Sequence, residues 1–220
     1  MGSLLGASAL EVRPERSSPA DLRSLAMLPP MSIPPEQSHL PGGVVFVGGA
    51  WNPGSTLLGL MLGAHPSLFF AGEVRESGFL GDPSTPLPKR VCKLCGPACE
   101  VWTDDLRGMS GVDLYGTLAL RSRCPIVVDS SKRIDWIERQ VTAGHGIVPL
   151  NLVVLTRDGR AVVNSRIRGK PATAGHQARK WIARMRATEA LASRWPGSVH
   201  RVRGRRCARS PASSASRSIR

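Results

Sequence analysis

Three short segments made almost entirely of apolar residues limit the folds that are open to this chain. They read VVFVG at residues 44–48, PIVVD at 125–129 and LNLVVLT at 150–156, and a helix-like pattern follows each of them. Strands that are apolar on both faces are typical of parallel sheets, because helices cover both sides of such sheets. We therefore expect an α/β fold with a parallel sheet flanked by helices.

The remaining elements are expected between and after these strands. Helices are predicted at residues 55–64, 112–120, 132–142, 159–167 and 175–195, and a short strand at 68–74. Residues 78–108 are rich in Gly, Pro and Cys, a composition that favours irregular structure.

The composition divides the chain into three parts. Residues 1–42 are rich in Pro and Ser and carry little periodic pattern, so we expect a disordered leader there. Residues 43–202 carry the α/β pattern and form the expected domain. Residues 203–220 have almost no aliphatic content, which suits either a disordered basic tail or a chain that leaves its natural reading frame near Val202.

The positive charge of the chain does not by itself identify a partner. The formal net charge is +14, but residues 201–220 hold seven arginines and no acid, which leaves +7 for the other 200 residues. That balance suits an anionic small ligand as well as a nucleic acid, so charge does not decide between them. We expect no specific nucleic-acid partner. No run approaches the roughly 20 apolar residues of a membrane span, and the N-terminus lacks the pattern of a secretory signal. A cytoplasmic location is the resulting expectation.

The segment GGAWNPGSTLL, residues 48–58, has the glycine spacing of a phosphate-binding loop. Gly49 and Gly54 fit the pattern, but Ser55 stands where an ATPase or GTPase carries lysine. A loop between a buried strand and a helix points backbone N–H groups and the positive helix end at one anion. Ser55 and Thr56 add hydroxyl donors, so we expect phosphate or sulfate to bind here.

The chain resembles the sulfotransferases that use 3'-phosphoadenosine 5'-phosphosulfate (PAPS), especially their bacterial and tyrosylprotein branch. The family loop reads G-x-x-[RK]-S-G-[ST]-[ST]-L-L and precedes a His-Pro pair. Here Gly49 and Gly54 to Leu58 match this loop, and His65-Pro66 matches the pair. Three more segments follow in the family's order, and the resemblance covers residues 44–195. They are AGEVRE (71–76), VDSSK (128–132) and LTRDGRAVVNSRIR (155–168).

The resemblance implies both a fold and a ligand. The fold is a core like that of the P-loop nucleotide kinases, and the reaction moves a sulfuryl group from PAPS to a hydroxyl or amine without a metal. Arg157 and Ser165 would hold the 3'-phosphate. The loop would hold the 5'-phosphosulfate through Gly49, Asn52, Gly54, Ser55, Thr56 and Leu57. The acceptor would be a small molecule or a glycan.

Two residues match the family's catalytic positions. Glu73 is the candidate base for the acceptor proton, and Lys132 would neutralise charge on the bridging oxygen as its bond to sulfur breaks. The alternatives are a Glu73 that only pairs with Arg75 and a Lys132 that is solvated. His65 is a weaker candidate base, since a packing or capping role suits it better.

The loop departs from the family pattern at the cationic position. Asn52 replaces the Arg or Lys, and Pro53, which has no N–H, replaces the Ser. Loss of that cation would cost about 3 kcal/mol of transition-state stabilisation, roughly a hundredfold in rate. A catalytically impaired nucleotide-binding relative is therefore the main alternative, and a P-loop kinase or NTPase is a weaker one. The family also continues beyond the long helix, and SVHRV at 198–202 matches the start of a further strand there.

Cys92, Cys95 and Cys99 form a C-x-x-C-x-x-x-C pattern in the irregular segment. Such spacing suits zinc, with Cys124 or a histidine as a fourth ligand. Cysteine-rich loops are also similar to those of bacterial sulfotransferase relatives, so local shaping of the substrate side is the preferred interpretation. Five cysteines, an odd number, do not suit a secreted disulfide framework.

Overall fold

The computed structural model describes residues 40–168 and 173–203. All of them belong to one compact unit, residues 33–220. The expected leader, apart from residues 40–42, and the expected basic tail after Arg203 lie outside the described residues. The α/β domain can therefore be compared with its prediction almost completely.

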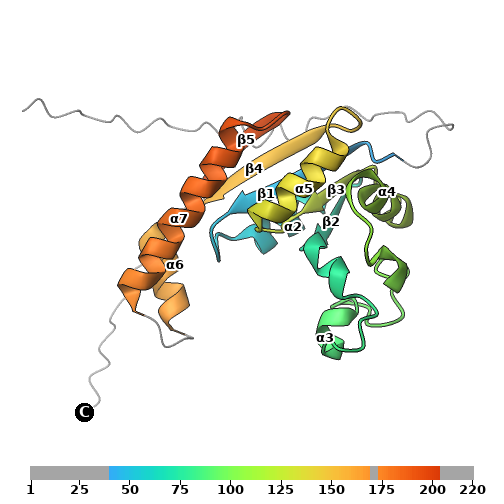
Figure 1. Ribbon diagram of the computed structural model, residues 1–220, viewed down its shortest axis with the longest axis horizontal. Coiled ribbons are helices and arrows are strands. Elements are labelled where there is room, and N and C mark those ends of the chain that lie inside the picture. The colour runs from blue at the N-terminus through green and yellow to red at the C-terminus, as the bar shows by residue number, and fades with distance from the viewer. Residues whose placement is uncertain (1–39, 169–172, 204–220) are drawn as a thin grey trace, which may run out of the picture. The chain divides into compact units, whose positions relative to one another are not determined.

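The described part of the chain contains one five-stranded sheet in which every pairing is parallel. Its order is β2-β3-β1-β4-β5 (Figure 1). The strands are β1 (Gly43–Gly49), β2 (Leu68–Gly72), β3 (Ile126–Asp129), β4 (Leu150–Thr156) and β5 (Ser198–Arg203). The predicted α/β fold is confirmed, and β5 occupies the segment in which a further strand was expected.

Helices connect the strands and cover the sheet. They are α2 (Ser55–Leu62), α3 (Leu87–Arg90), α4 (Gly111–Ser122), α5 (Ile134–Gly144), α6 (Gly159–Ile167) and α7 (Ala174–Ser193), with short 3-10 helices η1 (Val74–Phe79) and η2 (Asp104–Leu106). The segment 78–108 contains only the short helices η2 and α3 and the end of η1, in keeping with its predicted irregularity.

Several predicted boundaries were wrong by one or two residues, and two of them lie beside the candidate site. The strand expected at 68–74 ends at Gly72, because the backbone there turns to φ +73 after a register shift from Phe70. Residues 74–79 then form η1. The helix expected from Lys132 begins at Ile134, because Arg133 still has an extended backbone. Both errors fall in the segments that follow β2 and β3, so they affect the candidate site directly.

Helices cover both faces of the sheet. Val44 and Phe46 of β1 pack in one core, together with side chains of α4, α5 and α7. Val45 and Val47 point to the other face, where Leu58 and other α2 residues join the second core. Both cores are filled from the same strand, which explains why the β1 segment is apolar throughout.

Contact between α2 and β2 depends on Gly59. A Cβ at this position would lie 2.2 Å from a ring carbon of Phe70. We expect Gly59→Ala to lower the free energy of unfolding by about 1–2 kcal/mol, because overpacking outweighs alanine's better helix propensity. Urea unfolding measures the change. Gly78→Ala is the matched control, since nothing lies within 4 Å of its added methyl group; equal stability of the two variants would contradict the packing argument.

Candidate functional site at the carboxyl edge of the sheet

The residues that the sequence singles out follow the carboxyl ends of four strands. The glycine loop follows β1, Glu73 follows β2, Lys132 follows β3 and Arg157 follows β4. Because β1 lies between β3 and β4, its loop is flanked by the loops of both neighbours. Ligands of open α/β sheets bind at this edge, near the point where the strand order reverses.

The loop from Gly49 to Gly54 has a backbone that only certain residues can adopt. Gly49 has φ +141, and a Cβ there would lie 2.4 Å from the Leu155 carbonyl oxygen, so only glycine fits. Asn52 has φ +51, a region that asparagine tolerates better than most residues. Gly54 is the N-cap of α2 and offers no side-chain oxygen to the helix. The first-turn N–H groups therefore lack a side-chain cap, as an anion-binding helix end requires.

Asn52 joins this loop to the two residues assigned to the 3'-phosphate by resemblance. Arg157 donates a hydrogen bond from Nη1 to the carbonyl oxygen of Asn52, at 3.1 Å. The side-chain amide of Asn52 donates to Oγ of Ser165, at 3.3 Å. All three residues are exposed, so their polar groups are accessible to a ligand.

The other loop residues differ in accessibility. Ser55 is buried at the start of α2, whereas Thr56 and Leu57 are exposed. The Thr56 hydroxyl is thus open to a ligand, while Ser55 is enclosed by the loop and helix.

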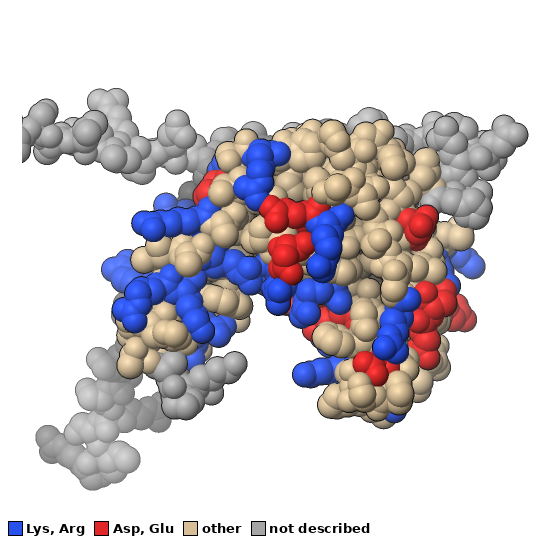
Figure 2. All heavy atoms as spheres, viewed as in Figure 1, with Lys and Arg blue, Asp and Glu red and all other residues tan. Residues whose placement is uncertain are grey.

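Two further arginines lie beside the loop, and the sequence analysis did not identify them. The guanidinium carbons of Arg166 and Arg184 lie 4.5 and 5.5 Å from the ring centre of Trp51, so the tryptophan contacts both cations. Burial, and to a lesser extent repulsion from Arg133, lowers the pKa of Arg184. Figure 2 shows Lys and Arg side chains gathered over α6 and α7, the helices that carry Arg166 and Arg184.

Glu73 and Lys132 form an ion pair. Nζ of Lys132 lies 2.9 Å from Oε1 of Glu73 and also donates to the Ser130 carbonyl at 3.2 Å. The lysine side chain is 16% exposed and the glutamate 38%, so the pair lies at the edge of solvent. Arg75, the partner considered from the sequence, lies over the Phe79 ring instead.

Asp129 at the end of β3 is the buried centre of a hydrogen-bond network. Its Oδ1 accepts from the backbone N–H groups of Val74 and Ser131, at 3.2 and 2.6 Å. Its Oδ2 accepts from the Tyr115 hydroxyl at 2.8 Å and the Trp136 indole at 3.1 Å. Burial raises the pKa of Asp129, although hydrogen bonds from Ser131, Tyr115 and Trp136 act against the shift.

The same network fixes the positions of Glu73 and Lys132. Ser130 donates its N–H to the Gly72 carbonyl at 2.7 Å, and Arg75 donates its N–H to Oγ of Ser131 at 3.0 Å. Together with the bond from Val74 to Asp129, these contacts tie the loop after β2 to the loop after β3. The carboxylate and the ammonium group are thus held beside each other by backbone contacts.

The remaining candidates from the sequence are His65 and the cysteines, and their contacts are of a different kind. Nδ1 of His65 accepts a hydrogen bond from the Ser67 N–H at 3.2 Å, so the ring stabilises the turn after α2. Cys92, Cys95 and Cys99 lie together, with their Sγ atoms within 4.8 Å of one another. Cys124 lies outside this group and directs its thiol to the Pro66 carbonyl, so it is not the fourth ligand considered from the sequence.

Searches for known relatives do not add to this geometry. No protein-family model matches the chain, and no curated protein matches it in sequence. Within residues 40–168 and 173–203, no helix combines the length and apolar character needed to cross a membrane.

Proposed function

We propose that this chain binds PAPS and transfers its sulfuryl group to a hydroxyl or amine acceptor. The observation that carries the proposal is the contact of Asn52 with both Arg157 and Ser165, because it unites the glycine loop with the expected 3'-phosphate residues. A cytoplasmic location and a small-molecule or glycan acceptor belong to the same proposal.

In this proposal, one group of residues binds the 5'-phosphosulfate of PAPS and another group binds its 3'-phosphate. The uncapped N–H groups at the start of α2 and the exposed Thr56 hydroxyl hold the 5'-phosphosulfate. Arg157 presents a planar guanidinium and Ser165 a hydroxyl to the 3'-phosphate, the group that distinguishes PAPS from ATP. Ser55 at the lysine position of NTPases argues against a nucleotide kinase.

The catalytic step follows from the Glu73–Lys132 pair. The acceptor oxygen or nitrogen bonds to sulfur while the bond from sulfur to the bridging oxygen breaks. Glu73 takes the acceptor proton, and Lys132 neutralises the negative charge that develops on the bridging oxygen. Their separation of 2.9 Å keeps both groups at one place on the sheet edge.

A second candidate function is nucleotide binding with little turnover. It is favoured by Asn52 and Pro53, which leave the family's cationic loop position neutral and remove one N–H donor. Arg166 and Arg184 contact Trp51 beside this position, and their charge offsets part of the loss. Measured turnover in the presence of bound PAPS distinguishes the two functions.

Calorimetry with 3',5'-adenosine diphosphate tests the proposed site. We expect the wild-type chain to bind it, and Arg157→Ala to bind ten- to a hundredfold more weakly, because a charge-assisted hydrogen bond contributes about 1.5–3 kcal/mol. Arg160→Ala is the matched control. Its arginine lies three residues away, is highly exposed and pairs with Asp158.

Three results would count against this assignment. No binding by the wild-type chain contradicts the proposed function. If Arg160→Ala weakens nucleotide binding as much as Arg157→Ala does, binding depends on general positive charge and not on Arg157 in particular. Equally tight binding of ATP with Mg²⁺ favours the kinase or NTPase alternative.

A further inference from the structure

Cys92, Cys95 and Cys99, the three cysteines after α3, lie close together in space. Their Sγ atoms all lie within 4.8 Å of one another. In a tetrahedral zinc site with Zn–S bonds of about 2.3 Å, sulfur atoms are about 3.8 Å apart. Shifts of about 1 Å or less would therefore place all three sulfurs around one ion.

The first two cysteines lie on a tight turn of the backbone. Gly96 has φ +67 and donates its N–H to the Cys92 carbonyl at 3.0 Å, which closes the turn. Cys92 and Gly96 also pair as an isolated antiparallel bridge. The turn therefore holds Cys92 and Cys95 close together, as ligands of one metal ion must be.

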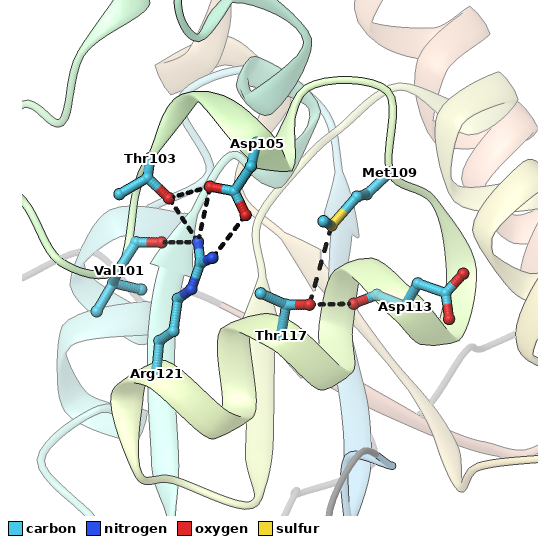
Figure 3. A network of polar contacts seen from close by, with 7 residues as sticks. All are labelled: Val101, Thr103, Asp105, Met109, Asp113, Thr117 and Arg121. Carbon is cyan, nitrogen blue, oxygen red and sulfur yellow. Dashed lines mark hydrogen bonds and ion pairs between the residues drawn. The ribbon is translucent and has the colours of Figure 1, made fainter.

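The third cysteine is held from the other side of the loop. Cys99 is buried, and its Sγ accepts the N–H of Trp102 at 3.3 Å. The following residues are fixed to α4, since Arg121 donates to the Val101 carbonyl, the Thr103 hydroxyl and the Asp105 carboxylate (Figure 3). Cys99 is thus presented to the turn by a rigid part of the fold.

We propose that Cys92, Cys95 and Cys99 bind one zinc ion as thiolates. Among the described residues, no other Cys, His, Asp or Glu belongs to this group, so a water molecule or a bound ligand would complete four-coordination. The ion would fix the excursion between η1 and α4. This site is separate from the proposed sulfuryl transfer, which needs no metal.

Metal content of the full chain, purified without a histidine tag and under reducing conditions, tests the site. We expect one zinc per chain by elemental analysis. Replacement by Co²⁺ should give thiolate-to-cobalt charge-transfer absorption and the ligand-field bands of a tetrahedral site. Cys95→Ser should weaken Co²⁺ binding about a hundredfold or more, because a thiolate ligand is lost. Cys95 is exposed, so its replacement should leave the fold intact, as circular dichroism will show.

Cys124→Ser is the matched control, because its thiol lies outside the group. It should keep one zinc per chain and the full cobalt spectrum. The proposal is overturned if the reduced wild-type chain holds no zinc after incubation with it, or if Cys95→Ser binds Co²⁺ as tightly as the wild type. Loss of the spectrum in Cys124→Ser as well would also overturn it.

Discussion

Asp129→Ala is expected to lower the free energy of unfolding by more than about 3 kcal/mol. The carboxylate is fully buried and accepts four hydrogen bonds, two from backbone N–H groups and two from the side chains of Tyr115 and Trp136. Each buried donor that loses its acceptor costs about 1–3 kcal/mol, so even partial rearrangement leaves a large loss. Urea unfolding, followed by tryptophan fluorescence, measures the change.

Asp135→Ala serves as the control for loss of a carboxylate. Asp135 is more than half exposed and pairs with Arg133 at the surface, so its replacement should change stability by less than about 1 kcal/mol. A similar loss in both variants would show that Asp129 has no special structural role.

The pH dependence of stability provides a second test of Asp129. Because burial raises its folded-state pKa above the unfolded value near 3.8, the folded protein binds more protons between these two values. Stability from this group is therefore greatest below the unfolded pKa and falls as pH rises through the folded pKa. Asp129→Asn cannot titrate, so the stability of the wild type relative to Asp129→Asn should increase as the pH is lowered through this window.

The sheet was predicted well because strands that are buried on both faces consist almost entirely of apolar residues, a pattern that is visible in the sequence. The segment LNLVVLT coincides with β4 in full, and Gly159–Ile167 coincides with α6. The end of β2 was less predictable. Gly72 turns the backbone to φ +73, and the hydrogen bond from Ser130 to Gly72 that accompanies this turn comes from the loop after β3. A single-sequence pattern contains no information on that contact.

The candidate site was predictable only where one segment carries a whole motif. The glycine loop and the segment with Arg157 and Ser165 could be found separately, but their link through Asn52 spans more than a hundred residues. The position of Arg184 beside the loop was not predicted, because its contact with Trp51 depends on how α7 crosses the sheet. Asp129 was seen only as part of a motif, since an acidic residue at a strand end suggests solvent or ligand rather than full burial.

Lys132→Ala is expected to slow the release of 3',5'-adenosine diphosphate from PAPS by about a hundredfold or more. Removing one group that stabilises developing charge costs about 2.7–4 kcal/mol in the transition state. Water can act as the acceptor, so the slow hydrolysis of PAPS reports on this step before the natural acceptor is known. Calorimetry with 3',5'-adenosine diphosphate should show only a few-fold change in affinity, because Lys132 acts on charge that forms during the reaction.

Arg133→Ala separates this role from a general loss of positive charge. Arg133 is the next residue, is more than half exposed and pairs with Asp135, so both hydrolysis and binding should stay near the wild-type values. Stability should also change little in Lys132→Ala, because the partner Glu73 is 38% exposed and water can solvate its carboxylate. If Lys132→Ala weakens binding as much as it slows hydrolysis, the lysine is a nucleotide-binding group, and charge neutralisation at the bridging oxygen must be assigned to another residue.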